Sequence, residues 1–161
     1  MFRGNSTTGY ARASAGNTTW TNQVVEARFK PVSWSGTNRF LVLAARFVDI
    51  NNYYYLALRS NNTIELKRLQ NNTPTTLGTA NISVSTGTWY KVKLETIGTS
   101  LKAYVNDALM VSATDSAFPA GKIAVGVYYG QVHVDNVVVT SGVVGAPGSA
   151  SAPSPLPGAT Q

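Results

Sequence analysis

The sequence contains no cysteine and only one histidine in 161 residues. Disulfides, catalytic thiols, cysteine-based zinc sites and clusters of histidine ligands are therefore excluded. Long apolar segments are also missing, because the longest unbroken apolar run is Phe40 to Ala45. About 20 such residues are needed to cross a bilayer. We therefore expect a single domain with its own hydrophobic core and no membrane partner.

Charged residues are scarce as well, at 12% of the chain. Ser, Thr and Asn together number 45, so neutral hydroxyls and amides must supply most of the surface polarity. This composition is typical of an extracellular protein, and we predict that the protein is secreted. The opening residues, Met1 to Asn5, lack the apolar region of a secretory signal, so we expect a mature fragment of an exported parent.

The charge that is present is mainly positive, with 13 Lys and Arg against 7 Asp and Glu and a net charge of +6. Such an excess favours a polyanionic partner. The basic residues are spread singly, and Lys67 and Arg68 form the only adjacent pair. Because no basic tail or nucleic-acid motif is present, we expect no nucleic acid and favour an acidic polysaccharide.

The composition changes at Ser141. From there to Gln161 the chain has no charged or aromatic residue and holds four of its seven prolines. Proline-rich segments of this kind commonly tether one domain to another. We predict a module at residues 1–141 and a linker at residues 142–161, joined to a catalytic domain.

Within the module, apolar and polar residues alternate with a period of two, as where Val25, Ala27 and Phe29 share one face. Turn residues separate nine such segments, which predicts an all-β fold of two antiparallel sheets packed as a sandwich. Residues 40–58 also fit a helix, but the break at Asn51 and Asn52 favours a hairpin of two strands. The nine predicted strands cover residues 24–30, 39–49, 53–59, 63–69, 89–97, 101–105, 109–113, 122–129 and 132–140.

Candidate catalytic groups are few. Sugar hydrolysis usually needs two converging carboxylates, and the three Glu residues lie on three different predicted strands, so we do not expect a glycosidase. Gln131 and His133 share one strand face, which resembles a pair in alginate lyases of jelly-roll fold. The Arg-x-Glu-x-Arg strand and the Tyr-Phe-Lys strand of those enzymes are missing here. A histidine near the rim of a sheet is the alternative interpretation.

Basic and aromatic side chains concentrate on one predicted face. If Leu41, Leu43, Ala45 and Phe47 point toward the core, the alternate residues of this strand and its neighbours point outward. Aromatic rings can stack on sugars and Arg can hold a carboxylate, so this face suits an acidic polysaccharide. The alternative is that some of these tyrosines cover a second core. The predicted binding residues are Arg46, Tyr53, Tyr55, Arg59, Lys67, Tyr104 and Tyr128.

Five segments together resemble the concanavalin A-like, laminin-G-like domains attached to bacterial polysaccharide-degrading enzymes, among them pectate lyases. The likeness spans about residues 20–140 and depends on the order and spacing of the segments. They are residues 49–59 (DINNYYYLALR), 88–95 (TWYKVKLE), 101–107 (LKAYVND), 121–126 (GKIAVG) and 134–139 (VDNVVV).

The resemblance implies a jelly-roll sandwich acting as a monomeric, noncatalytic carbohydrate-binding module. Its ligand would be a plant or algal polysaccharide, preferably an acidic one such as pectate, to which it targets a linked enzyme. Related modules often hold a structural calcium ion, and Asp135 matches their ligand position, with Glu26 as a candidate second ligand. Two alternative functions stay open: a uronate lyase using His133 and a Tyr, and a lectin-like adhesion domain.

Overall fold

Ten antiparallel strands make up the part of the chain that the computed structural model describes, residues 1–141. The predicted linker at residues 142–161 lies outside the described residues. No helix in residues 1–141 is long and apolar enough to cross a membrane. The strands are β1 (Phe2–Ala15), β2 (Gln23–Trp34), β3 (Phe40–Asp49), β4 (Asn52–Arg59), β5 (Thr63–Gln70), β6 (Thr73–Asn81), β7 (Tyr90–Ile97), β8 (Ser100–Val105), β9 (Ala108–Thr114) and β10 (Lys122–Ser141).

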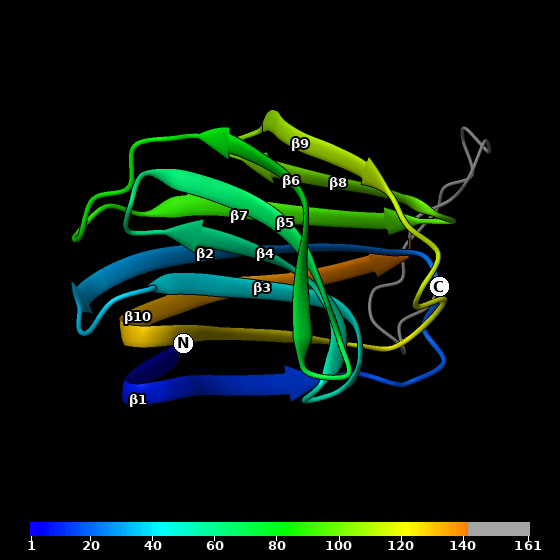
Figure 1. The fold of residues 1–161 in the computed structure, drawn as a ribbon, viewed down its shortest axis with the longest axis horizontal. Helices are drawn as coiled ribbons and strands as arrows, with labels where there is room; N and C mark the ends of the chain where they lie inside the picture. The colour runs from blue at the N-terminus through cyan, green and yellow to red at the C-terminus, as the bar shows by residue number, and fades with distance from the viewer. Residues whose placement is uncertain (142–161) are drawn as a thin grey trace.

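The strands form two layers that share β10 and β1. The first half of β10 pairs with β3 and its second half pairs with β2, while β1 follows β10 along both halves. We call the layer β6-β5-β4-β3-β10-β1 sheet 1 and the layer β9-β8-β7-β2-β10-β1 sheet 2. Figure 1 shows β1 and β10 turning back together at the left of the view. The predicted two-sheet antiparallel sandwich is confirmed.

The bend of β10 lies at Tyr129, which has a positive φ of 54°, and at the following Gly130. A Cβ added to Gly130 would lie 2.7 Å from the carbonyl oxygen of Ser33 and 2.9 Å from the ring of Trp34, so only glycine fits beside β2 here. The sequence predicts a break between two strands at this point. The structure instead has one strand that passes from sheet 1 to sheet 2.

The core lies between the two sheets, and alternate residues of each strand enter it. In β2, Val25, Ala27 and Phe29 are buried as predicted. The two sheets also approach each other at the rim where β6 and β9 meet. There Gly78 leaves room for Val111, whose Cγ1 would lie 2.5 Å from an added Cβ.

Two strands were not predicted, β1 and β6. Each pairs with one other strand and carries polar side chains, so neither shows a clear apolar alternation. Pro74 also argues against a strand in the sequence, but β6 is an edge strand, where proline is tolerated. Both strands matter for function because they border the outer face of sheet 1.

Candidate functional site

The outer face of sheet 1 holds a cleft of about 300 Å³. The side chains that line it come from β1, β3, β4, β5, β6, β10 and the neighbouring turns. Several of them belong to a buried cluster on this face that also contains the small residues Val42, Ala44, Ala57 and Ala124. The lining residues are Tyr10, Asn38, Phe40, Tyr55, Arg59, Glu65, Lys67, Leu69, Asn72, Pro74 and Tyr128.

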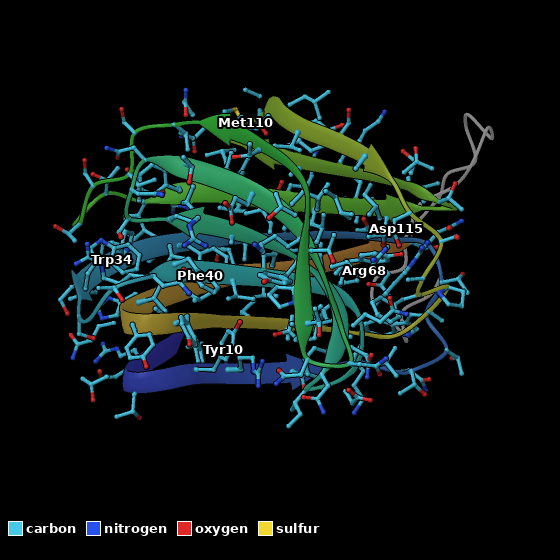
Figure 2. All side chains as sticks on the ribbon, viewed as in Figure 1. Tyr10, Trp34, Phe40, Arg68, Met110 and Asp115 are labelled. Atoms are coloured by element: carbon cyan, nitrogen blue, oxygen red, sulfur yellow. The ribbon has the colours of Figure 1, made fainter. Side chains whose placement is uncertain are left out.

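Aromatic rings form one wall of the cleft. The ring of Phe40 on β3 stacks on that of Tyr128 on β10, with centroids 5.0 Å apart and planes at 24°. Tyr10 on β1 packs against Tyr128 at 4.5 Å and meets Phe40 edge-on at 6.1 Å. Figure 2 labels Tyr10 and Phe40 on this face. Flat ring faces next to an open cleft are suited to contact with sugar C–H groups.

A network of three charged groups forms a wall next to these rings, where the guanidinium of Arg59 lies 5.1 Å from the ring centroid of Phe40. Oε1 of Glu65 accepts hydrogen bonds from Nη1 of Arg59 at 3.2 Å and from Nζ of Lys67 at 3.3 Å. Arg59 also donates to Asn38, and Lys67 donates to Oγ1 of Thr76 at 2.9 Å. Because the cations flank one carboxylate, this wall presents hydrogen-bond donors and an acceptor side by side. Such a set is complementary to sugar hydroxyls, which donate and accept.

The tyrosine hydroxyls of this face stay neutral. Burial raises the pKa of Tyr10, Tyr53 and Tyr55 above the ordinary value, and nearby tyrosines raise those of Tyr10 and Tyr55 further. Arg12 on β1 donates to the Tyr53 hydroxyl at 2.7 Å, and its guanidinium lies 4.2 Å from the centroid of the Tyr10 ring. These hydroxyls therefore act as neutral hydrogen-bonding groups and not as phenolate bases at neutral pH.

The structure brings four of the predicted binding residues to this cleft: Tyr55, Arg59, Lys67 and Tyr128. Tyr53 lies on the same face but is fully buried, as the alternative of a second core expects. Tyr104 is separate, because it lies on β8 of sheet 2. There Nζ of Lys93 is 4.2 Å from its ring centroid and its hydroxyl donates to Glu95 at 3.5 Å.

The predicted outward orientation of Arg46 is wrong. Its side chain is 2% exposed and donates to the backbone carbonyls of four residues. The cause is a bulge: Arg46 has a positive φ of 48°, and the register of β3 with β4 shifts after Ala45. The same bulge turns Phe47, predicted for the main core, to the outer face. The four acceptors are Thr21 (2.9 Å), Gly98 (2.7 Å), Phe118 (3.1 Å) and Thr96 (3.1 Å).

Several cleft residues were missed by the sequence analysis, notably Tyr10 and its neighbour Arg12 on β1. The run Tyr10-Ala11-Arg12-Ala13 does alternate large polar with small residues, and this signal identifies an outward face once β1 is recognised as a strand. Phe40 shares the outward parity of Val42 and was detectable in the same way. Asn72 comes from the β5–β6 turn and Pro74 from the start of β6, and only the fold places them at the cleft.

The predicted calcium ligand, Asp135, lies on β10 in sheet 2. Its Oδ1 accepts a hydrogen bond from the backbone N–H of Asn136 at 3.0 Å. The register pairs Asp135 with Arg28 and Glu26 with Val138, so the two acids are not opposite each other. Within residues 1–141, no three His, Cys, Asp or Glu side chains gather closely enough to hold a metal. The described carboxylates therefore do not form the oxygen cluster typical of calcium, and calcium at Asp135 stays a prediction.

Comparison with known protein families and with curated protein sequences finds no match. Solved structures do match. A carbohydrate-binding module from Bacillus subtilis, CBM66, superposes with a TM-score of 0.73 at 20% identity, covering 85% of this chain and 84% of that one. Alginate lyase AlgAT5 of polysaccharide lyase family 7 gives 0.60 at 19% identity, covering 83% and 63%. Galectin-Va of Xenopus laevis gives 0.60 at 20% identity, covering 80% and 93%.

These likenesses define the fold of the chain. Residues 1–141 form a jelly-roll sandwich of the concanavalin A-like type, as the resemblance in the sequence implies. At such low identity the neighbours carry no function over by themselves, because one fold hosts many activities. The function has to be argued from the cleft.

Proposed function

We propose that this chain is a noncatalytic carbohydrate-binding module that holds a polysaccharide in the cleft of sheet 1. The observation that carries the proposal is the cleft itself, in which the rings of Tyr10, Phe40 and Tyr128 lie next to the hydrogen-bonded Arg59, Glu65 and Lys67. Rings that stack on sugar faces and groups that bond sugar hydroxyls are the two contacts that sugar binding requires.

The names of the structural neighbours support a sugar ligand. They include a carbohydrate-binding module, an alginate lyase, a beta-glucanase and galectins. Sugar binding in the cleft is therefore consistent with the functions named for other proteins of this fold.

The lyase alternative is weaker because His133 and the cleft tyrosines lie on different faces of the sandwich, and because burial and Glu95 raise the pKa of Tyr104, the tyrosine that shares sheet 2 with His133. His133 sits between the buried Val132 and Val134, so it points outward from sheet 2. The cleft tyrosines point outward from sheet 1, on the other side of the core. The raised pKa values of Tyr10 and Tyr55 also oppose a phenolate base in the cleft.

The finer parts of the proposal concern the ligand's charge and the context of the module. The net charge of +6 supports an acidic polysaccharide such as pectate. We further propose a secreted monomer, joined through residues 142–161 to a catalytic domain that it keeps near its substrate. Such tethering works through effective concentration and needs no chemistry from the module.

Affinity electrophoresis tests the proposal directly. The protein is run through gels that contain polygalacturonate, alginate or a neutral glucan, and the same polysaccharides are assayed by ultraviolet absorbance for unsaturated products. We expect retardation in at least one gel and no product. Unsaturated product would overturn the noncatalytic assignment, and unchanged mobility in every gel would overturn the binding function.

A cleft variant locates the binding. Glu65→Gln keeps the size of the side chain but removes the carboxylate that orders Arg59 and Lys67, so retardation in the neutral glucan gel should weaken. Glu95→Gln removes a carboxylate from sheet 2 and serves as the matched control, with retardation in that gel unchanged. Equal effects of the two variants would show that the binding site is not the cleft.

A further inference from the structure

Three basic residues form a row across the outer face of sheet 2. The register places His133 of β10 between Arg3 of β1 and Lys30 of β2. The residues that flank them along β10 and β2, such as Val132, Val134 and Phe29, are buried, so the row points away from the core. With neighbouring strands about 4.8 Å apart, the row is about 10 Å long.

The cations in this part of sheet 2 lack acidic partners. Within residues 1–141, Arg3, Arg28 and Lys30 take part in no ion pair. The nearest acid by register is Asp135, opposite Arg28, and it accepts a backbone N–H.

The other part of the same face is different, because most of its cations are paired. Lys91 pairs with Asp107 at 2.7 Å, and Lys93 lies 3.8 Å from Glu95. Lys102 stands opposite Glu95 in the register of β7 and β8 and takes part in no ion pair within residues 1–141. Unpaired cations are therefore more numerous on β1 and β2 than on β7 and β8.

Trp89 and a row of polar groups complete this surface. The guanidinium of Arg28 and the ammonium of Lys30 lie 5.1 and 5.2 Å from the Trp89 ring centroid, which holds both cations against the ring. Asn5, Gln131 and Ser33 form the adjacent row in register. Their amides and hydroxyl are suited to the hydroxyls of a ligand whose acidic groups meet the cations.

We propose that this surface, the row Arg3–His133–Lys30 with the adjacent Asn5, Gln131 and Ser33, binds a segment of acidic polysaccharide. It is a second site on the opposite side of the sandwich from the cleft. The inference deepens the proposed function, and it assigns the preference for acidic ligands to this row. The cations of the cleft are bonded to Glu65, whereas those of the row are available. A nucleic acid fits less well, because Arg28 and Lys30 cover the ring that a base would stack on.

The test compares two double variants of the full chain that remove the same charge. Arg3→Gln with Lys30→Gln disables the row, and Lys91→Gln with Lys93→Gln removes two cations of the same sheet that are paired with carboxylates. Retardation in polygalacturonate gels should weaken about tenfold for the first pair, the loss of about one charge-assisted hydrogen bond. The second pair should change it less than twofold. Equal weakening would overturn the proposal, because net charge alone would then explain binding.

Two further arms separate this site from the cleft. Retardation in a neutral glucan gel should respond to Glu65→Gln and not to the row variant, so loss of the cleft and loss of the row give different patterns. A single-stranded oligonucleotide is the competitor of another class. If it binds as tightly as polygalacturonate and loses affinity equally in the row variant, the assignment to polysaccharide is wrong. Far-ultraviolet circular dichroism should be unchanged, since the substituted side chains point outward.

Discussion

The outer faces of the two sheets differ in how they use the same residue types. On sheet 1, aromatic and hydrogen-bonded charged side chains line a cleft in the outer face. On sheet 2, long charged side chains alternate along β2, β7 and β8. In the cleft, Arg59 and Lys67 bond one carboxylate, whereas Arg3 and Lys30 have no acidic partner within residues 1–141.

From this difference we expect the cleft of sheet 1 to recognise ligands mainly by shape and the outer face of sheet 2 to attract them mainly by charge. A cleft whose cations are bonded to a carboxylate would discriminate ligands by contact with rings and hydroxyls. A face with unbalanced cations attracts polyanions with less regard to shape, and salt weakens it because the charges are exposed. Predictions that separate the two faces therefore test the interpretation better than any test of binding alone.

The largest expected effect concerns Arg46, which belongs to neither binding face and joins β3 of sheet 1 to β7 of sheet 2. Arg46→Met leaves four backbone carbonyls without their donor and should lower the free energy of unfolding by at least about 3 kcal/mol, measured by urea denaturation. Arg46→Lys should recover only part, because an ammonium cannot reproduce the planar set of donors. Binding by the folded fraction should stay unchanged at both faces. If the Arg46→Met protein is stable but no longer binds polysaccharide, Arg46 contributes to the binding site.

The next largest effect distinguishes the aromatic residues of the two faces. Tyr128→Ala removes a ring of the cleft wall and should weaken binding of the preferred polysaccharide about tenfold or more, since a stacked ring contributes about 1.4 kcal/mol or more. Tyr104→Ala removes a ring from sheet 2 and should change the affinity less than twofold. Titration calorimetry measures both. Equal losses would show that sheet 2 contributes aromatic contacts as well.

The sequence predicted most of the fold because apolar alternation survives wherever a strand has one face in the core. It predicted β3, β4, β5, β7, β8 and β9 to within one residue at each end, and with them the outward orientation of Tyr55 and Arg59. The sequence analysis missed the strands that show no clear alternation of apolar and polar residues. The edge strands β1 and β6 carry polar residues on both faces, so their share of the cleft was not foreseen.

The candidate site was harder to predict for a second reason. Parity arguments assume an unbroken strand, and one bulge after Ala45 exchanged the orientations of Arg46 and Phe47. A positive φ at a residue such as Arg depends on tertiary contacts, here the carbonyls that receive its side chain. No spacing rule within the strand contains that information. The cross-strand row of Arg3, His133 and Lys30 likewise requires the register, because its members are far apart in the sequence.

The smallest expected effect lies at the rim where the sheets meet, which carries neither binding face. Tyr54 donates to Oδ1 of Asp115 at 2.6 Å, the N–H of Ala117 donates to the same oxygen at 2.9 Å, and Arg68 donates to Oδ2. Figure 2 labels Arg68 and Asp115 at one end of the molecule. Burial alone would raise the pKa of Asp115, but these hydrogen bonds and the charge of Arg68 outweigh it, so its pKa is lowered.

A carboxylate with a lowered pKa stabilises the fold only while it is ionised. Its contribution is complete above the ordinary Asp pKa of about 3.9 and is lost as the pH falls through the lower value of the folded state. Urea unfolding at a series of pH values from about 6 down to 2 should therefore show a shallower decline of stability for Asp115→Asn than for the unchanged protein. Tyr54→Phe, which removes one of the three bonds, should lie between them. Identical slopes in all three proteins would mean that the rim is held by packing, and the two sheets would then be joined independently of this acid.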